Sequence, residues 1–178
     1  MQFTNAEKLM LVMIAEMHQA SSIKNGINSK LVQDALWSNN DWAIGWDVQL
    51  PWLQRDANPP YVNHVVDVLD MWTFIESGYR ALSPDDVKRV DVETGYQGGP
   101  KFSGFDGNNE SEEYSAARFL IEEMGRFSSF VGRDLNSHSP TIDHSRRRLA
   151  VFKSIRDGLG DRNPVRMNAD EIIEVVST

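Results

Sequence analysis

The stretch Val62–Tyr79, VNHVVDVLDMWTFIESGY, decides the fold class of this chain. At 100° per residue, its apolar side chains cover well over half of a helical circumference. Two prolines at 59 and 60 precede it, and proline is tolerated in a first helical turn because the amides there have no intrahelical partner. The pattern predicts a long, largely buried helix from Pro60 to about Ala81. Its narrow polar strip consists of Asn63, Asp67 and Asp70.

One acidic residue of this helix falls inside the apolar arc. Glu76 projects there, and a buried carboxylate must meet a cation or take up a proton. A second helix is expected over residues 140–158, where Arg148 also falls on an apolar arc. We therefore predict a buried ion pair between Glu76 and Arg148.

Helical periodicity continues on both sides of this stretch and is divided by proline, glycine and asparagine. Thr4-Asn5-Ala6-Glu7 and Asn168-Ala169-Asp170-Glu171 both have the spacing of a capping box. Alternating strand patterns are scarce, so we expect an all-α fold, a single-domain irregular helical bundle of about six or seven helices over residues 1–178. The expected helices lie near residues 5–19, 29–41, 60–81, 111–127 and 140–158 and from 169 on, with short ones after Ser83 and, as an option, at 41–48.

Composition excludes several classes of function. The 178 residues contain no cysteine, so disulfides, thiolate nucleophiles, zinc fingers and cysteine-held clusters are ruled out, which suits a cytoplasmic protein. The apolar run Leu9–Ala15 is too short to span a membrane and carries no basic flank, so we interpret it as part of a helix of the mature fold. We expect a cytoplasmic location and no membrane partner.

The net charge of −8 is unevenly distributed along the chain. It divides into −9 over residues 1–117, +4 over 118–166 and −3 over 167–178. The overall field repels long polyanions. Arg146-Arg147-Arg148 cannot share one face, because consecutive helical residues point 100° apart. Nucleic-acid binding is therefore the weaker interpretation, and a solvated helix face is the stronger one.

The stretch 95–107 is rich in glycine. It lacks the Lys-Ser/Thr end and the preceding strand of a phosphate-binding loop, so a connector is favoured over a phosphate cradle. We expect Phe102 and Phe105 to enter the core, Gly104 and Gly107 to adopt positive φ, and Asp106 to fix the turn.

Motifs across the chain resemble one known family. Phe102-Ser103-Gly104-Phe105-Asp106 is similar to an aromatic-x-Gly-Phe-Asp signature of the YfbU family, and Val65–Trp72 and Asn136–Pro140 also fit it. The resemblance spans nearly the full length and is least specific between residues 20 and 60. It implies a bacterial, soluble, mostly α-helical protein with no established activity. The other matching residues are Thr4-Asn5-Ala6, Leu9, Leu11, Tyr114, Arg118-Phe119, Gly125-Arg126, Leu149 and Ala169–Ile172.

Three arginines and a histidine of the second half form a candidate ligand site. Arg118, Arg126, Arg133 and His138 would converge as a pocket for a small phosphate or carboxylate, which arginine binds well. The alternative is a set of structural salt bridges with nearby acidic residues. The four histidines show no metal-ligand spacing, so no metal site and no cofactor are expected, and no catalytic residue can be named.

Tryptophans are concentrated in one short stretch that the family resemblance does not cover. Trp37, Trp42, Trp46 and Trp52 lie within sixteen residues. Core packing is one explanation, and clustered tryptophans are also typical anchors of protein interfaces. We therefore expect the protein to act by self-association or by contact with a protein partner. Binding or turnover of a small anion at the arginine–histidine group is the alternative.

Overall fold

The computed structural model describes residues 3–24, 26–48, 57–160 and 165–178. Within these ranges the chain forms eight α-helices and no strand, which confirms the all-α prediction. An isolated bridge joins Phe105 to Asn136. The helices are α1 Asn5–Ala20, α2 Ser29–Trp37, α3 Ile44–Asp47, α4 Pro60–Arg80, α5 Pro84–Thr94, α6 Ser111–Arg118, α7 Ile142–Leu159 and α8 Ala169–Val176.

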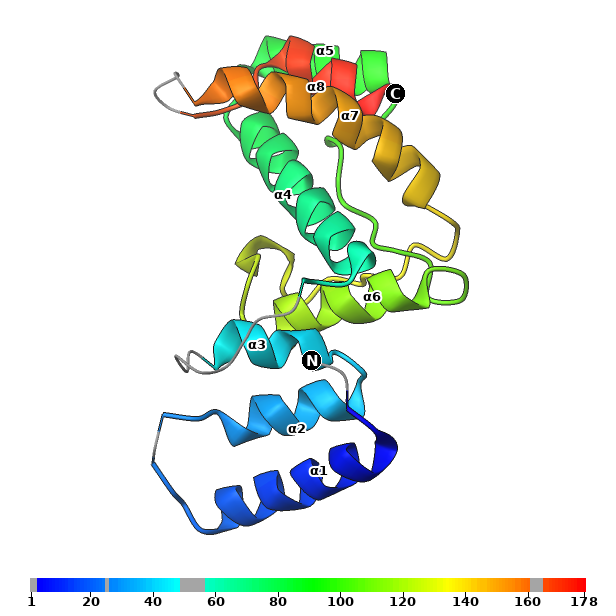
Figure 1. Ribbon diagram of the computed structural model, residues 1–178. Coiled ribbons are helices and arrows are strands. Elements are labelled where there is room, and N and C mark those ends of the chain that lie inside the picture. Colours follow the sequence, from blue (N-terminus) through cyan, green and yellow to red (C-terminus); the bar gives the residue numbers. More distant parts are fainter. Residues whose placement is uncertain (1–2, 25, 49–56, 161–164) are drawn as a thin grey trace.

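Helix α4 is the central helix and runs from the group of α5, α7 and α8 to α6 (Figure 1). Helices α6, α7 and α8 pack against it, and α5 packs on α8. Helix α1 packs on α2, and this pair lies at the end of the molecule opposite α5, α7 and α8. Helix α1 therefore packs mainly against one helix, whereas α4 is surrounded by three.

The predicted central helix is confirmed in bounds and in burial. Val62, Val65 and Ile75 are completely buried, as expected for a helix whose apolar arc exceeds half its circumference. On its polar strip, Asp67 and Asp70 meet Lys153 and Arg156 of α7 at 2.7 and 2.8 Å. Helix α7 is thus held to α4 by ion pairs at the edge of the apolar contact.

The stretch 102–110 is a connector built into the core. Phe102 and Phe105 are buried and contact each other edge to face, as predicted. Gly104 has a φ of +94°, and a Cβ there would lie 1.8 Å from the Leu135 carbonyl oxygen. The expectation of positive φ at Gly107 is wrong, since this residue is not among the glycines with positive φ. Its amide donates a hydrogen bond to the Asn136 side chain.

Glu110 joins this connector to two helices. Its buried carboxylate accepts hydrogen bonds from the amides of Asp106 and Ile142 and from the Thr141 amide and hydroxyl. Burial alone would raise the pKa of this carboxyl, but the hydrogen bonds outweigh it and hold the pKa below the ordinary value. One side chain therefore fixes the starts of α6 and α7 together.

The predicted partner of Glu76 is wrong, although its burial is confirmed. Arg133 binds both carboxylate oxygens of Glu76, at 2.8 and 2.7 Å, and the Phe102 amide donates to the same group. Arg148 instead donates to the Val176 carbonyl oxygen. The helical wheels gave the correct face of each helix. They could not show that Arg133, which lies in a loop, occupies the position next to the Glu76 carboxylate.

Helix α6 ends earlier than the sequence predicted. After Arg118 the backbone continues as a π-helical segment over Phe119–Glu123, and the chain then turns at Gly125, which has a φ of +64°. The wide turn buries Phe119, Leu120 and Ile121 together. Arg126 therefore lies beyond the helix and not on its face.

Candidate functional site

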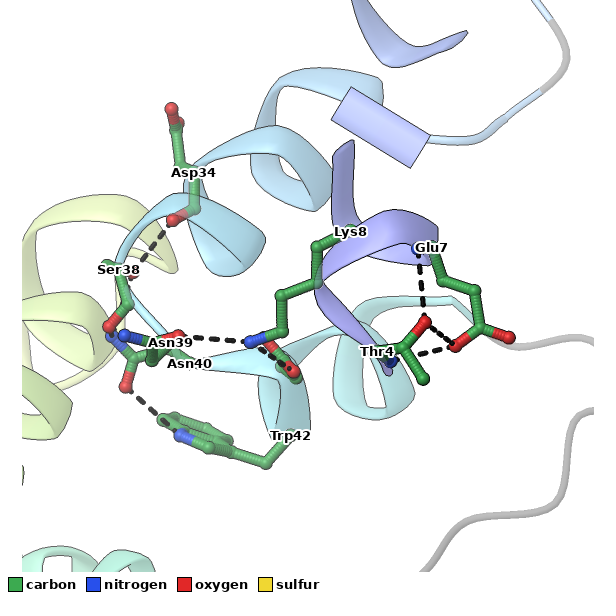
Figure 2. Close-up of polar contacts among 9 residues, drawn as sticks. Thr4, Glu7, Lys8, Asp34, Ser38, Asn39, Asn40 and Trp42 are labelled. Atoms are coloured by element: carbon green, nitrogen blue, oxygen red, sulfur yellow. Dashed lines mark hydrogen bonds and ion pairs between the residues drawn. The ribbon is translucent and has the colours of Figure 1, made fainter. Parts of the chain in front are cut away.

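The N-terminal helix presents the candidate site, and its first turn is fixed by a capping box. The Thr4 hydroxyl accepts a hydrogen bond from the Glu7 amide, while the Glu7 carboxylate accepts from the Thr4 amide at 2.8 Å (Figure 2). This arrangement satisfies amides that the helix itself leaves unpaired. The predicted capping box is confirmed, and α1 begins at Asn5.

A lysine attaches α1 to the turn that follows α2. The Lys8 ammonium group donates to the Asn39 side chain at 3.0 Å and lies 2.8 Å from the Asp41 carboxylate (Figure 2). Asn39 is held at a φ of +57°, a conformation that asparagine tolerates better than most residues. The contact sets the position of α1 relative to this turn.

A buried asparagine attaches the same turn to the rest of the molecule. Asn40 donates to the hydroxyls of Ser38 and Ser115, and Ser115 lies on α6. Its side-chain oxygen accepts from the indole of Trp42, as Figure 2 shows. The pair α1 and α2 is therefore held in place by specific polar contacts with its surroundings.

Helix α1 is apolar on two opposite sides. Leu11, Val12 and Ala15 face inward, and Ala15 is buried. Five large apolar side chains face outward and are each more than half exposed; we call them the outer face of α1. They are Leu9 (63%), Met10 (55%), Met13 (56%), Ile14 (59%) and Met17 (68%).

Polar contacts bound the outer face along the side toward α2. Gln33 of α2 donates to Glu16, and Gln19 of α1 donates to Gln33. A contiguous apolar surface of this kind, rimmed by polar groups, marks an interaction site and offers no catalytic group.

The outer face was not among the sites predicted from the sequence, although the sequence carries a signal for it. The run Leu9–Ala15 contains seven consecutive apolar residues, which is nearly two turns of helix. A helix packed against one neighbour can bury only one side of such a run. The excess apolar residues therefore predict a second contact surface.

The four members of the predicted anion pocket each have a partner of their own. Arg118 pairs with Glu122 at 2.7 Å, and Arg133 is held by Glu76. The guanidinium of Arg126 lies over the Trp46 ring, while His138 is exposed beside Asp134. Nearby carboxylates and rings satisfy these cations individually, which is the alternative that the sequence left open.

The tryptophan cluster also divides between different environments. Trp42 is buried against Phe119 and Trp46, so the prediction of an interface is wrong for this residue. Trp46 is partly buried and donates to Asn58. Trp37 is 72% exposed and stays a predicted contact residue. Trp52 lies outside the described residues.

Trp37 borders a cavity between α2 and α6. The cavity has a volume of about 490 Å³ and is also lined by Tyr114 and Phe119. Its charged side chains already have partners, since Arg118 binds Glu122 and Lys30 binds Asp34. No charge at this cavity calls for a ligand of opposite sign.

Two further features of the described ranges concern membrane spans and metal sites. None of the helices described is long and apolar enough to cross a membrane. In the same ranges, no three histidine or carboxylate side chains gather as a metal site would require.

The sequence was compared with known proteins. A family model described as the YfbU domain matches residues 1–177. A UPF0304 protein of Methanocaldococcus jannaschii is 31% identical over 96 residues, which are 51% of this chain and 54% of that protein. The match thus covers about half the length of this curated relative. Because the family model covers nearly the whole sequence, the chain belongs to the YfbU family.

Proposed function

We propose that this protein acts by associating with a second copy of itself through the outer face of α1. The carrying observation is the exposure of five large apolar side chains on one side of a peripheral helix. Burying such side chains against another apolar surface contributes about 1.5–3 kcal/mol for each one fully buried. Monomeric proteins rarely leave so much contiguous apolar surface in water.

The spacing of the outer face favours a second copy over an unrelated partner. Leu9, Met13 and Met17 follow each other at intervals of four and are therefore symmetric about Met13. In an antiparallel pair, Leu9 of one copy meets Met17 of the other, and Met13 meets its own counterpart. Rows spaced by four residues interdigitate in the commonest class of helix packing.

The chemistry of the outer face fits the same arrangement. A two-fold interface brings identical groups together, so a charge near its centre would face a like charge. The five residues carry none. Three of them are methionines, whose flexible side chains adapt to an opposing apolar surface. Two α1–α2 pairs joined in this way would complete a four-helix bundle.

Sedimentation velocity of the native chain and of Met13→Glu tests the proposal. The native chain is expected to sediment as a dimer, and Met13→Glu as a monomer, because the variant places two like charges at the centre of an apolar contact. We expect the substitution to weaken dimerisation by several kcal/mol, which raises the Kd of the dimer roughly 100-fold or more.

Val92→Glu is the matched control. Val92 is an 81% exposed apolar side chain of α5, and α5 lies at the end of the molecule opposite α1 (Figure 1). This variant should keep the mass of the native protein. A native chain that is monomeric at every concentration, or a Met13→Glu variant that remains dimeric, would contradict the proposal.

A further inference from the structure

Arg148 of α7 differs from two cations farther along the same helix. Lys153 and Arg156 each face an aspartate of α4. Arg148 has no carboxylate within 4.0 Å among the residues that the structure describes. Its Nη2 donates to the Val176 carbonyl oxygen at 3.0 Å, and its guanidinium lies 5.7 Å from the centre of the Trp72 ring. The charge of this arginine therefore has no anionic partner within those parts of the chain.

The environment makes an uncompensated arginine costly. Arg148 is partly buried, and its Nε is buried without a hydrogen-bond acceptor in the described ranges. A guanidinium cannot lose its proton in a protein, so it stays charged in this place. Burial of an unpaired charge is unfavourable unless an anion accompanies it.

A cavity of about 280 Å³ opens beside this arginine, between α4, α7 and the connector 102–110. Its walls also include Ser139, Thr141 and His144. Trp72 and Phe102 supply apolar walls, and no aspartate or glutamate is among the lining residues described. The volume lies just below the usual range for small-molecule sites, so only a small ligand would fit.

We propose that this cavity binds a small organic anion. A carboxylate or phosphate group would lie against the Arg148 guanidinium, and an apolar or aromatic body would lie against Trp72 and Phe102. The site differs from the arginine–histidine group considered from the sequence, because none of those four residues lines the cavity. It is also separate from the outer face of α1.

Calorimetric titration of the native protein with benzoate and phenyl phosphate tests the proposal. At least one of them should bind with a Kd at or below about 1 mM, and the tighter of the two identifies the preferred head group. Benzylamine has a similar body with the opposite charge and should not bind. Failure of both anions to bind, or equal binding of benzylamine, would overturn the proposal.

Arg148→Gln should weaken anion binding by about tenfold or more, since hydrogen bonds to charged groups are the strong ones. Arg146→Gln removes the same charge from an exposed side chain of α7 that pairs with Asp143 and does not line the cavity, and it should bind as the native protein does. Unchanged binding by Arg148→Gln would contradict the assignment.

A measurement on the native chain keeps the test valid if Arg148→Gln does not fold. In nitrogen-15 spectra, the Trp72 indole resonance should shift with the anion while that of Trp37 stays in place. The opposite pattern would place the anion elsewhere. The same titration of Met13→Glu should give the same Kd, so this proposal can fail or succeed independently of self-association.

Discussion

The connector 102–110 and helix α1 show opposite uses of apolar residues. Around the connector, Phe102 and Phe105 are buried, and the carboxylates of Glu76 and Glu110 are fully engaged by donors within the chain. On α1, five large apolar side chains have no cover in the described structure. One region completes the fold, and the other is the surface that we propose a second copy covers.

The largest expected effect comes from closing the tightest contact of the connector. Gly104→Ala places a methyl group against the Leu135 carbonyl in a backbone conformation that alanine rarely adopts. We expect a loss of about 4 kcal/mol or more in the free energy of unfolding, or failure to fold. Chemical denaturation followed by circular dichroism measures this.

Gly132→Ala separates the two causes. Gly132 also has positive φ, at +78°, but a Cβ there meets nothing within 4 Å. It should lose only the conformational cost, about 1–2 kcal/mol. Equal losses in the two variants would show that the connector is not packed as described.

Breaking the buried ion pair should have the next largest effect. Glu76→Gln leaves the Arg133 guanidinium without its bidentate partner, and loss of one member of a buried pair costs about 3–5 kcal/mol. Glu122→Gln, in an exposed pair with Arg118, should change the free energy of unfolding by no more than about 1 kcal/mol. Similar small effects for both variants would contradict the importance of the Glu76–Arg133 pair for the fold.

Glu110 should make the fold sensitive to acid. Its pKa is lowered in the folded state, so its contribution is complete above the unfolded value near 4.5 and is lost as pH falls through the folded pKa. Each unit of lowering corresponds to about 1.4 kcal/mol. Unfolding free energies measured from pH 7 to pH 3 should fall less steeply in Glu110→Gln than in the native protein. Parallel profiles would contradict this role.

Most of the fold could be predicted from local patterns, because capping boxes, prolines and apolar arcs depend only on residues that are close together in the sequence. The bounds of α4 and α8 followed from such signals. The partner of Glu76 did not, since wheels show which way a side chain faces but not which loop reaches it. The π-helical turn after Arg118 has no periodic signal in the sequence. Because the helix ends there, Arg126 does not lie on the same helix as Arg118, although the sequence predicted that it would.

The candidate site was predictable in kind but not in place. Self-association was inferred from tryptophans, yet Trp42 proved to be a core residue. The apolar run in α1 carried the better signal, because its length exceeds what one neighbouring helix can cover. Counting the surface that a helix can bury is therefore more informative than the presence of residues typical of interfaces.

Methionine oxidation tests the central claim most directly. Met10, Met13 and Met17 all lie on the outer face of α1, while Met71 and Met167 are buried and serve as internal references. In native protein treated with peroxide and analysed by mass spectrometry, the three should be protected at high protein concentration and oxidised on dilution. In Met13→Glu, Met10 and Met17 should oxidise readily at every concentration. Fast oxidation of all three in the native chain, independent of concentration, would contradict the account.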